Sequence, residues 1–167
     1  MLRSRRGFAL IEALVVLGLI GILVSIATPY YQVFMQNASY RSAARDIAGT
    51  LRQARAEAVT KNREHRVQID FAANSFQMSR GNQARGTAAA ETNWQYFGLQ
   101  TLSPLVDLRG LDGDGNCSNN TDSLDLRFFP DGTASNVAGI CIQNRAGERR
   151  FLVQLTSRTT GHVEVRR

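Results

Sequence analysis

Glu12 is the only charged residue in the most apolar part of the chain, the stretch 8–28, which reads FALIEALVVLGLIGILVSIAT. A carboxylate costs about 2 to 3 kcal/mol at the centre of a membrane helix and less near the interface, so such a group usually marks a function. Glu12 lies one helical turn after Phe8. If the chain were cut between Gly7 and Phe8, the new amine would lie at a helix N-terminus, where the dipole disfavours positive charge. The Glu12 carboxylate would offset that charge, which matters most in an apolar environment.

No catalytic arrangement accompanies this acid. The chain has two histidines, His65 and His162, and no sequence-local Ser/His/Asp or Cys/His pattern. We expect both histidines to be solvated at the surface. The sequence therefore predicts a protein that is not an enzyme, and the alternative of a membrane-tethered periplasmic enzyme has no visible catalytic residues to support it.

Oxygen-bearing side chains recur at alternate positions in one loop. Asp112, Asp114 and Asn116 are spaced like the opening ligands of a calcium loop. However, Cys117 stands in the place of the usual glycine, and Ser123 in that of the bidentate glutamate. We expect a solvated turn and no cofactor, with calcium binding as the alternative.

Cys117 and Cys141 are the only cysteines, too few for a zinc site or a disulfide-dense scaffold. A disulfide between them is predicted if the compartment is oxidising, and two free thiols are the alternative. Closing a loop of this length would stabilise the fold by about 3 kcal/mol on the chain-entropy model.

Arginine gathers toward the C-terminal end, and a clustered basic face can bind phosphates in a salt-sensitive way. The candidate DNA-binding residues are Arg149, Arg150, Arg158, Arg166 and Arg167. Glu164 lies among them and would repel phosphate. DNA is therefore an alternative partner.

The apolar stretch 8–28 is long enough to cross a membrane. At about 1.5 Å per residue it spans roughly 31 Å, close to the ~30 Å hydrocarbon core of a bilayer. Three of the +6 formal charges are Arg3, Arg5 and Arg6, which predicts a cytoplasmic N-terminus and an exported C-terminal part. The alternatives are a secretory signal cut after Ser25-Ile26-Ala27, a plain single-pass anchor and a buried core helix. Glu12 argues against the first two, since neither needs a carboxylate.

Beyond the apolar stretch the helical pattern continues as an amphipathic one. Apolar residues recur at three- and four-residue steps, at Phe34, Ala38, Ala43, Ile47, Leu51, Ala54 and Ala58. We predict a helix over about 8–61, with Asn62 as its stop. Pro29 should kink or locally melt this helix, because it removes one hydrogen bond and clashes with the carbonyl of Ser25. A helix that ends just past the membrane is the alternative.

The remaining chain alternates with a period of two, as strands do. The stretches 66–71 and 75–78 predict a hairpin, and further strands are expected at 94–102, 124–129, 139–143, 149–156 and 161–165. The segment 81–92 reads as a mobile loop and 107–123 as a connection. The fold class is thus α+β, a long N-terminal helix packed on an antiparallel β-sheet. The expected segments are a leader (1–7), a transmembrane and polymerisation helix (8–29), its amphipathic half (30–62) and a globular β-rich domain (63–167).

The segment RGFALIEALVVLGLIGIL resembles the type IV prepilin signature. It has a short basic leader, the Gly7/Phe8 junction and a glutamate, Glu12, at the fifth mature position, although Ala9 and Ala13 replace the commoner Thr and Leu or Met. The resemblance implies that prepilin peptidase removes residues 1–7 and methylates the Phe8 amine. It also implies assembly roles for Glu12 and for Pro29.

Three further stretches resemble the GspH/FimT group of minor pilins and pseudopilins: LRQARAEAVTKNREHRVQID (51–70), LRFFPDGTASN (126–136) and the C-terminal TGHVEV. The resemblance implies a pilin-like fold and a subunit that helps initiate or cap a type IV pilus or a type II secretion pseudopilus. It further implies a single-pass inner-membrane protein with a periplasmic domain, which later joins the filament. The implied partners are other pilins or pseudopilins, prepilin peptidase, the inner-membrane assembly platform and, before assembly, membrane lipid.

Competence pilins of the same group bind DNA through a C-terminal Gly-Arg-x-Arg element. The corresponding stretch here is Gly161-His162-Val163-Glu164, followed by Val165-Arg166-Arg167. Both arginines are displaced relative to that element, so DNA binding stays the alternative function.

Overall fold

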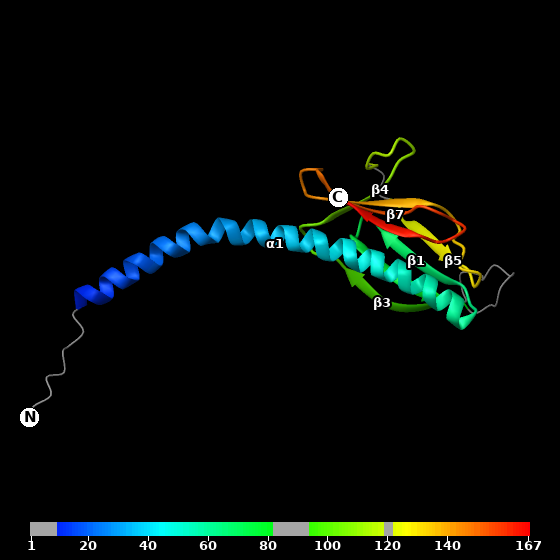
Figure 1. Cartoon of the computed structure of the whole chain (residues 1–167), viewed down its shortest axis with the longest axis horizontal. Helices are drawn as coiled ribbons and strands as arrows, with labels where there is room; N and C mark the ends of the chain where they lie inside the picture. Colours follow the sequence, from blue (N-terminus) through cyan, green and yellow to red (C-terminus); the bar gives the residue numbers. More distant parts are fainter. Residues whose placement is uncertain (1–9, 82–93, 119–121) are drawn as a thin grey trace, which may run out of the picture. The chain divides into compact units, whose positions relative to one another are not determined.

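The computed structural model describes residues 10–81, 94–118 and 122–167. The chain divides into two compact units, residues 1–37 and 38–167. One helix, α1 (Leu10–Lys61), runs through both, and in the described chain it precedes the strands β1 to β8 (Figure 1). The boundaries predicted for the functional segments concern processing and membrane insertion, and they stay predictions.

Helix α1 passes through Pro29 without interruption. The predicted local melting and the alternative of a helix end are therefore both wrong, while a kink at this position stays a prediction. Proline removes one backbone donor, and hydroxyl side chains in the same turns bond to nearby helix carbonyls. Ser25 Oγ donates to the Ile22 carbonyl and Thr28 Oγ1 to that of Val24, each at 2.7 Å. Neither bond reaches the Ser25 carbonyl, which is the one that Pro29 leaves without its helical donor.

The second unit has a core built on the C-terminal half of α1. The predicted stripe is buried at Ala43, Ile47, Leu51, Ala54 and Ala58, and Tyr40, Ala44 and Ala48 widen it. The prediction is wrong for Phe34, which belongs to the first unit and is 67% exposed, and Ala38 is only partly buried. The helix ends as predicted, since Asn62 adopts a positive φ of 50° and the Arg63 N–H donates to the Ala58 carbonyl.

Two antiparallel four-stranded sheets complete this unit, where the sequence predicted one. The first has the order β3-β2-β1-β5 and contains β1 (His65–Asp70), β2 (Ser75–Arg80), β3 (Gln95–Thr101) and β5 (Leu124–Phe128). The second has the order β4-β6-β7-β8 and contains β4 (Asp107–Gly110), β6 (Ala138–Gln143), β7 (Arg149–Leu155) and β8 (Val163–Arg166). The predicted hairpin is confirmed as β1 and β2, which pair antiparallel through a turn that places Asn74 at φ 48°.

The prediction that 107–123 is only a connection is wrong, because it contains β4. Asp107 and Gly110 are poor strand formers. However, β4 pairs with β6, and Leu108 between them is fully buried. The predicted loop 81–92 lies, apart from Gly81, outside the described residues.

One hydrophobic cluster joins the helix stripe to inward-facing residues of both sheets. From the first sheet it takes Val67, Ile69, Leu126 and Phe128, and from the second Leu108, Ile140, Ile142, Val153 and Leu155. The second unit thus has its own core, which holds the C-terminal half of α1 in place on the two sheets.

Candidate functional site

The helical surface of the first unit is apolar and exposed. Large side chains are uncovered along its whole described length, with exposed fractions from 44% at Met35 to 80% at Leu10. Glu12 lies in the first turn of α1. In the described chain α1 is the one helix long and apolar enough to span a membrane, with a mean hydropathy of 2.7 in its most apolar window. Gly7 and Phe8 lie outside the described residues, so cleavage and methylation stay predictions.

In the second unit, Arg55 brings together three stretches that are far apart in the sequence. Its Nε donates to the Gly132 carbonyl at 3.2 Å, in the turn that follows β5. Gly161, in the turn before β8, packs so closely that an added Cβ would lie 2.8 Å from Arg55 Cδ and 3.0 Å from the Gly132 oxygen. Gly161 also has a positive φ of 56°. Glycine is therefore required twice over at this position, by backbone conformation and by space.

An open groove of about 490 Å³ lies beside this junction. One wall is a stripe of α1 and the other is the start of β8 with the turn before it; the lining residues are Arg52, Arg55, Ala56, Val59, Thr60, Gly161, His162 and Val163. Arg52 Nη2 donates to the Val163 carbonyl at 3.1 Å, which ties the two walls together. The groove has an apolar floor, two arginines and one histidine, and none of its lining residues in the described chain is an acid. Sequence reasoning missed this site, although the stretches that build it had been singled out as a resemblance.

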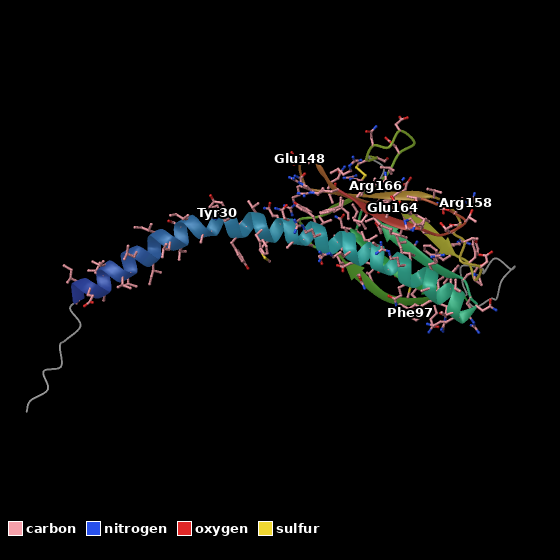
Figure 2. All side chains as sticks on the ribbon, viewed as in Figure 1. Tyr30, Phe97, Glu148, Arg158, Glu164 and Arg166 are labelled. Carbon is pink, nitrogen blue, oxygen red and sulfur yellow. A yellow bond between two sulfur atoms is a disulfide. The ribbon has the colours of Figure 1, made fainter. Side chains whose placement is uncertain are left out.

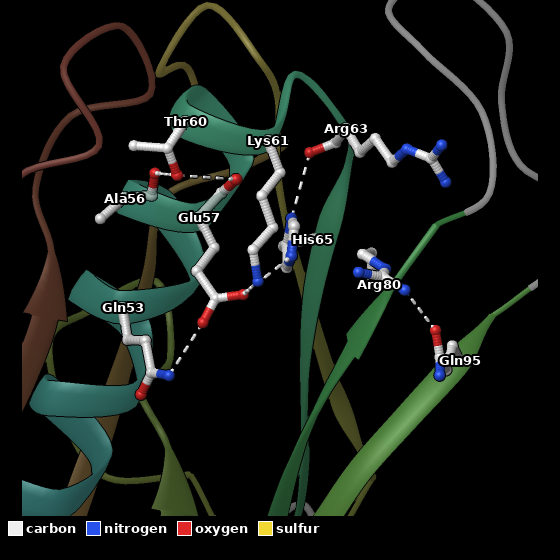
Figure 3. Close-up of polar contacts among 9 residues, drawn as sticks. All are labelled: Gln53, Ala56, Glu57, Thr60, Lys61, Arg63, His65, Arg80 and Gln95. Atoms are coloured by element: carbon white, nitrogen blue, oxygen red, sulfur yellow. Dashed lines mark hydrogen bonds and ion pairs between the residues drawn. The ribbon is translucent and has the colours of Figure 1, made fainter.

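Glu57, on the same helix, belongs to a different polar cluster (Figure 3). Its carboxylate accepts a hydrogen bond from Gln53 Nε2 at 2.9 Å and forms an ion pair with Lys61 Nζ at 2.5 Å. The hydrogen bonds from Lys61 and Gln53 lower the pKa of Glu57. His65 Nε2 lies 3.4 Å from Glu57 Oε2, and its Nδ1 is 3.1 Å from the Arg63 carbonyl.

His65 is fully buried, so the prediction that both histidines are solvated is wrong for this residue. Its position in β1 turns it inward, below the last turn of α1. Burial lowers its pKa below the ordinary value of 6.5, because an apolar environment disfavours the charged ring. The unfolded chain therefore binds a proton more readily than the folded one as the pH falls below 6.5, and folding loses stability in that window. His162, by contrast, is exposed.

A buried arginine organises the outer part of the first sheet. Arg66, 3% exposed, stacks 4.5 Å above the Trp94 ring and donates to Ser79 Oγ and Tyr96 Oη, at 3.3 and 2.9 Å. Its Nη1 lies 3.3 Å from the Asp125 carboxylate. A charge this deep is stable only when paired and hydrogen-bonded, and all these partners come from the described strands or, for Trp94, the residue before β3. The cluster serves to hold β1, β2, β3 and β5 together.

Glu64 lies next to this cluster and is almost fully buried. Burial raises its pKa, while the positive charge of Arg127 acts in the opposite direction. In the described chain its Oε2 and the indole nitrogen of Trp94 have no hydrogen-bond partner. The Glu64 carbonyl accepts a hydrogen bond from the Gly81 N–H at 2.8 Å, which ties the residue before β1 to the residue after β2.

Cys117 and Cys141 form a disulfide in the structure, with Cα atoms 5.8 Å apart. Cys141 is fully buried in β6, and the bond attaches the 112–117 loop to that strand. In this loop Asp112 Oδ1 accepts hydrogen bonds from the backbone N–H groups of Asp114 and Asn116, at 3.1 and 2.7 Å. Among the described residues no three His, Cys, Asp or Glu side chains are grouped to hold a metal ion. Calcium binding at Asp112, Asp114 and Asn116 stays the untested alternative to the predicted solvated turn.

The C-terminal arginines do not form one cluster. Arg149 and Arg150 begin β7, whereas Arg158 follows the end of that strand, and Figure 2 shows Arg158 apart from Arg166. Two of the five are paired with neighbouring acids, Arg150 with Glu148 at 2.7 Å and Arg166 with Glu164 at 2.8 Å. Arg167 lines a second groove, of about 290 Å³, together with Arg41, Ala44, Arg45, Phe151 and Val165.

Two family models match this sequence. Residues 43–159 match the model described as "Type II transport protein GspH", and residues 2–28 match that of the prokaryotic N-terminal methylation motif. The chain belongs to the GspH family. This is a family of structural pseudopilins and pilins, not of enzymes. A search of curated proteins found no match.

Solved structures share the fold of this GspH-family chain. The minor pseudopilin EpsH from the type 2 secretion system of Vibrio cholerae is 14% identical, with a TM-score of 0.59 over 76% of this chain and 94% of EpsH. The type IV minor pilin FimU of Pseudomonas aeruginosa is 17% identical, with a TM-score of 0.51 over 76% of this chain and 92% of FimU. The predicted pilin-like α+β fold and the resemblance to minor pilins and pseudopilins are confirmed. As a member of this family, the protein assembles with other subunits of the same kind.

Proposed function

We propose that this protein is a minor pilin or pseudopilin that helps initiate or cap a type IV pilus or a type II secretion pseudopilus. Prepilin peptidase removes residues 1–7 and methylates Phe8. The subunit then waits in the lipid of the inner membrane, with its second unit in the periplasm, until the assembly platform inserts it into the filament. An oxidising periplasm is compatible with the disulfide between Cys117 and Cys141.

The observation that carries this proposal is the uncovered apolar surface of α1, which contains the single carboxylate Glu12. A surface of this size is unstable in water and needs lipid or other apolar helices around it. Lipid alone would cover the apolar surface, but it gives no reason to keep a carboxylate in the segment. The amine of Phe8, in the same subunit or a neighbouring one, gives such a reason, because pairing it with the Glu12 carboxylate lowers the cost of burying each charge.

The test is incorporation of the full chain into filaments in its own cells. Glu12→Gln keeps the shape of the side chain and removes its charge, and we expect incorporation to fall at least tenfold while the protein remains in the membrane. Glu148→Gln, which changes an exposed acid of the second unit, is the matched control and should leave incorporation unchanged. Mass spectrometry of the mature N-terminus should find methylated Phe8. Unchanged incorporation of Glu12→Gln, or an N-terminus at Thr28, would refute the proposal.

A second function, binding of DNA for natural transformation, is favoured by one observation. Arg41 and Arg45 of α1 line the same groove as Arg167, and no described residue of its lining is an acid. Three guanidinium groups around a shallow groove could contact successive phosphates. We expect Arg166→Ala combined with Arg167→Ala to weaken binding of duplex DNA at low salt and to flatten its salt dependence. Arg158→Ala, at the other end of β7, is the control, and equal affinity of all variants would remove this function.

A further inference from the structure

We propose that the groove between α1 and the start of β8 receives a carboxylate-bearing apolar segment of a neighbouring pilin-family subunit. The groove is lined by Arg52, Arg55, Ala56, Val59, Thr60, Gly161, His162 and Val163. This proposal rests on the proposed function, because it names the contact by which the second unit joins the filament.

The arginines of this groove have backbone carbonyls as partners, where several other arginines have carboxylates. Five arginines of the described chain have a carboxylate within ion-pair distance: Arg66, Arg109, Arg127, Arg150 and Arg166. Arg52 and Arg55 bond instead to backbone carbonyls, those of Val163 and Gly132. Each contact uses one guanidinium nitrogen, and a guanidinium carries five N–H donors. In the described chain neither guanidinium has a carboxylate within ion-pair distance, and both side chains line the groove.

These guanidinium groups are held in place before any partner arrives. The carbonyl bonds fix Arg52 and Arg55, and the close packing of Gly161 against Arg55 Cδ leaves that side chain little room. A carboxylate that binds them loses less side-chain entropy than it would with free surface arginines. Charge-assisted bonds between arginine and carboxylate are also the stronger kind of hydrogen bond.

The rest of the lining favours a protein segment over a nucleic acid. Ala56, Val59 and Val163 present apolar surface between the charges, and Val59 is 49% exposed. An exposed apolar side chain beside a pre-oriented cation suits an acidic residue flanked by apolar ones. A phosphate backbone has no apolar side chain to place against this part of the lining, whereas an acidic residue flanked by apolar ones does. The charge and the apolar floor together therefore specify the occupant.

Ala56 offers a sharp test, because it is exposed and lies one turn after Arg52 on the groove side of α1. Ala56→Glu supplies a carboxylate from within the chain and offsets one of the two guanidinium charges, that of Arg52, since side chains at i and i+4 meet on a helix. Ala56→Gln has the same size without the charge and is the matched control. Both residues are good helix formers, so neither variant should disturb the fold.

The readout is photo-crosslinking from position 59 of the full chain in its own cells, after replacing Val59 with a benzophenone amino acid. With Ala56 or Ala56→Gln, we expect a crosslink to a protein that carries an N-terminal methylation motif, through a peptide that contains Asp or Glu. Ala56→Glu should lower its yield at least fivefold. Arg52→Gln, which keeps a donor for the Val163 carbonyl but loses the charge, should do the same.

Incorporation into filaments is measured in the same samples, which separates two failures. If the chain without these substitutions does not enter filaments, the proposed function is wrong and this contact falls with it. If the chain is incorporated but the crosslink is equal in Ala56→Glu and Ala56→Gln, only the present inference is overturned. A crosslink to nucleic acid, or to a protein outside the pilin family, overturns it as well.

Discussion

Gly161→Ala tests whether the junction around Arg55 is what holds the turn before β8 against α1. At this position alanine meets two separate costs. The positive φ of 56° is disfavoured for any residue with a Cβ, by about 1 to 2 kcal/mol, and the lower entropy of the unfolded alanine chain returns up to about 1 kcal/mol. The new Cβ would also lie 2.8 Å from Arg55 Cδ and Nε and 3.0 Å from the Gly132 oxygen.

The second cost comes from moving Arg55. The side chain must leave its position, and its hydrogen bond to the Gly132 carbonyl is lost. A hydrogen bond to a charged group contributes about 1.5 to 3 kcal/mol, and the partial exposure of Arg55 places this one at the lower end. The total loss of unfolding free energy is therefore about 2 to 3 kcal/mol.

Gly147→Ala is the control, because Gly147 has a positive φ of 80° and nothing within 4 Å of its added Cβ. It should lose only the conformational part, about 1 kcal/mol. The assay is urea unfolding of the full chain in mild detergent, followed by the fluorescence of Trp94, the only tryptophan, which is 6% exposed. Equal destabilisation by the two substitutions would show that Arg55 does not hold the junction.

Two further predictions concern His65 and the disulfide. Between pH 6.5 and pH 5 the second unit should lose stability in the native chain, by up to about 1.4 kcal/mol per pH unit, because the buried ring resists protonation. His65→Gln should flatten that slope and the exposed His162→Gln should not; parallel slopes in all three proteins would contradict the assignment. Cys141→Ala should lower the unfolding free energy by about 3 kcal/mol for lost loop closure, plus a smaller packing cost. Cys117→Ser loses the same loop closure at a partly exposed position, so it measures the loop-closure cost without the packing cost. Two reactive thiols in the denatured protein without substitutions would contradict the disulfide.

Local pattern predicted most of the secondary structure correctly. The helix, its end at Asn62, the hairpin of β1 and β2 and the strands β5 to β8 follow from periodicity and turn residues, which act over a few neighbouring positions. The apolar stretch with Glu12 was also recognised from neighbouring residues, and so were the motifs that indicated the family. The errors arose where long-range pairing overrides local preference. β4 exists because β6 supplies its hydrogen bonds, and the two-sheet arrangement depends on which strands pair.

Spatial proximity was beyond the reach of the sequence. Arg55, Gly132 and Gly161 lie in stretches that the resemblance had already marked, yet only folding shows that they touch. The burial of His65 is a similar case, because an alternating strand does not reveal which neighbours cover it. Residue types and their spacing thus determined the helix, the strands and the membrane-compatible segment. Contacts across about 80 to 110 residues decided the groove, since those distances are set by how α1 packs on the sheets and not by anything written beside each residue.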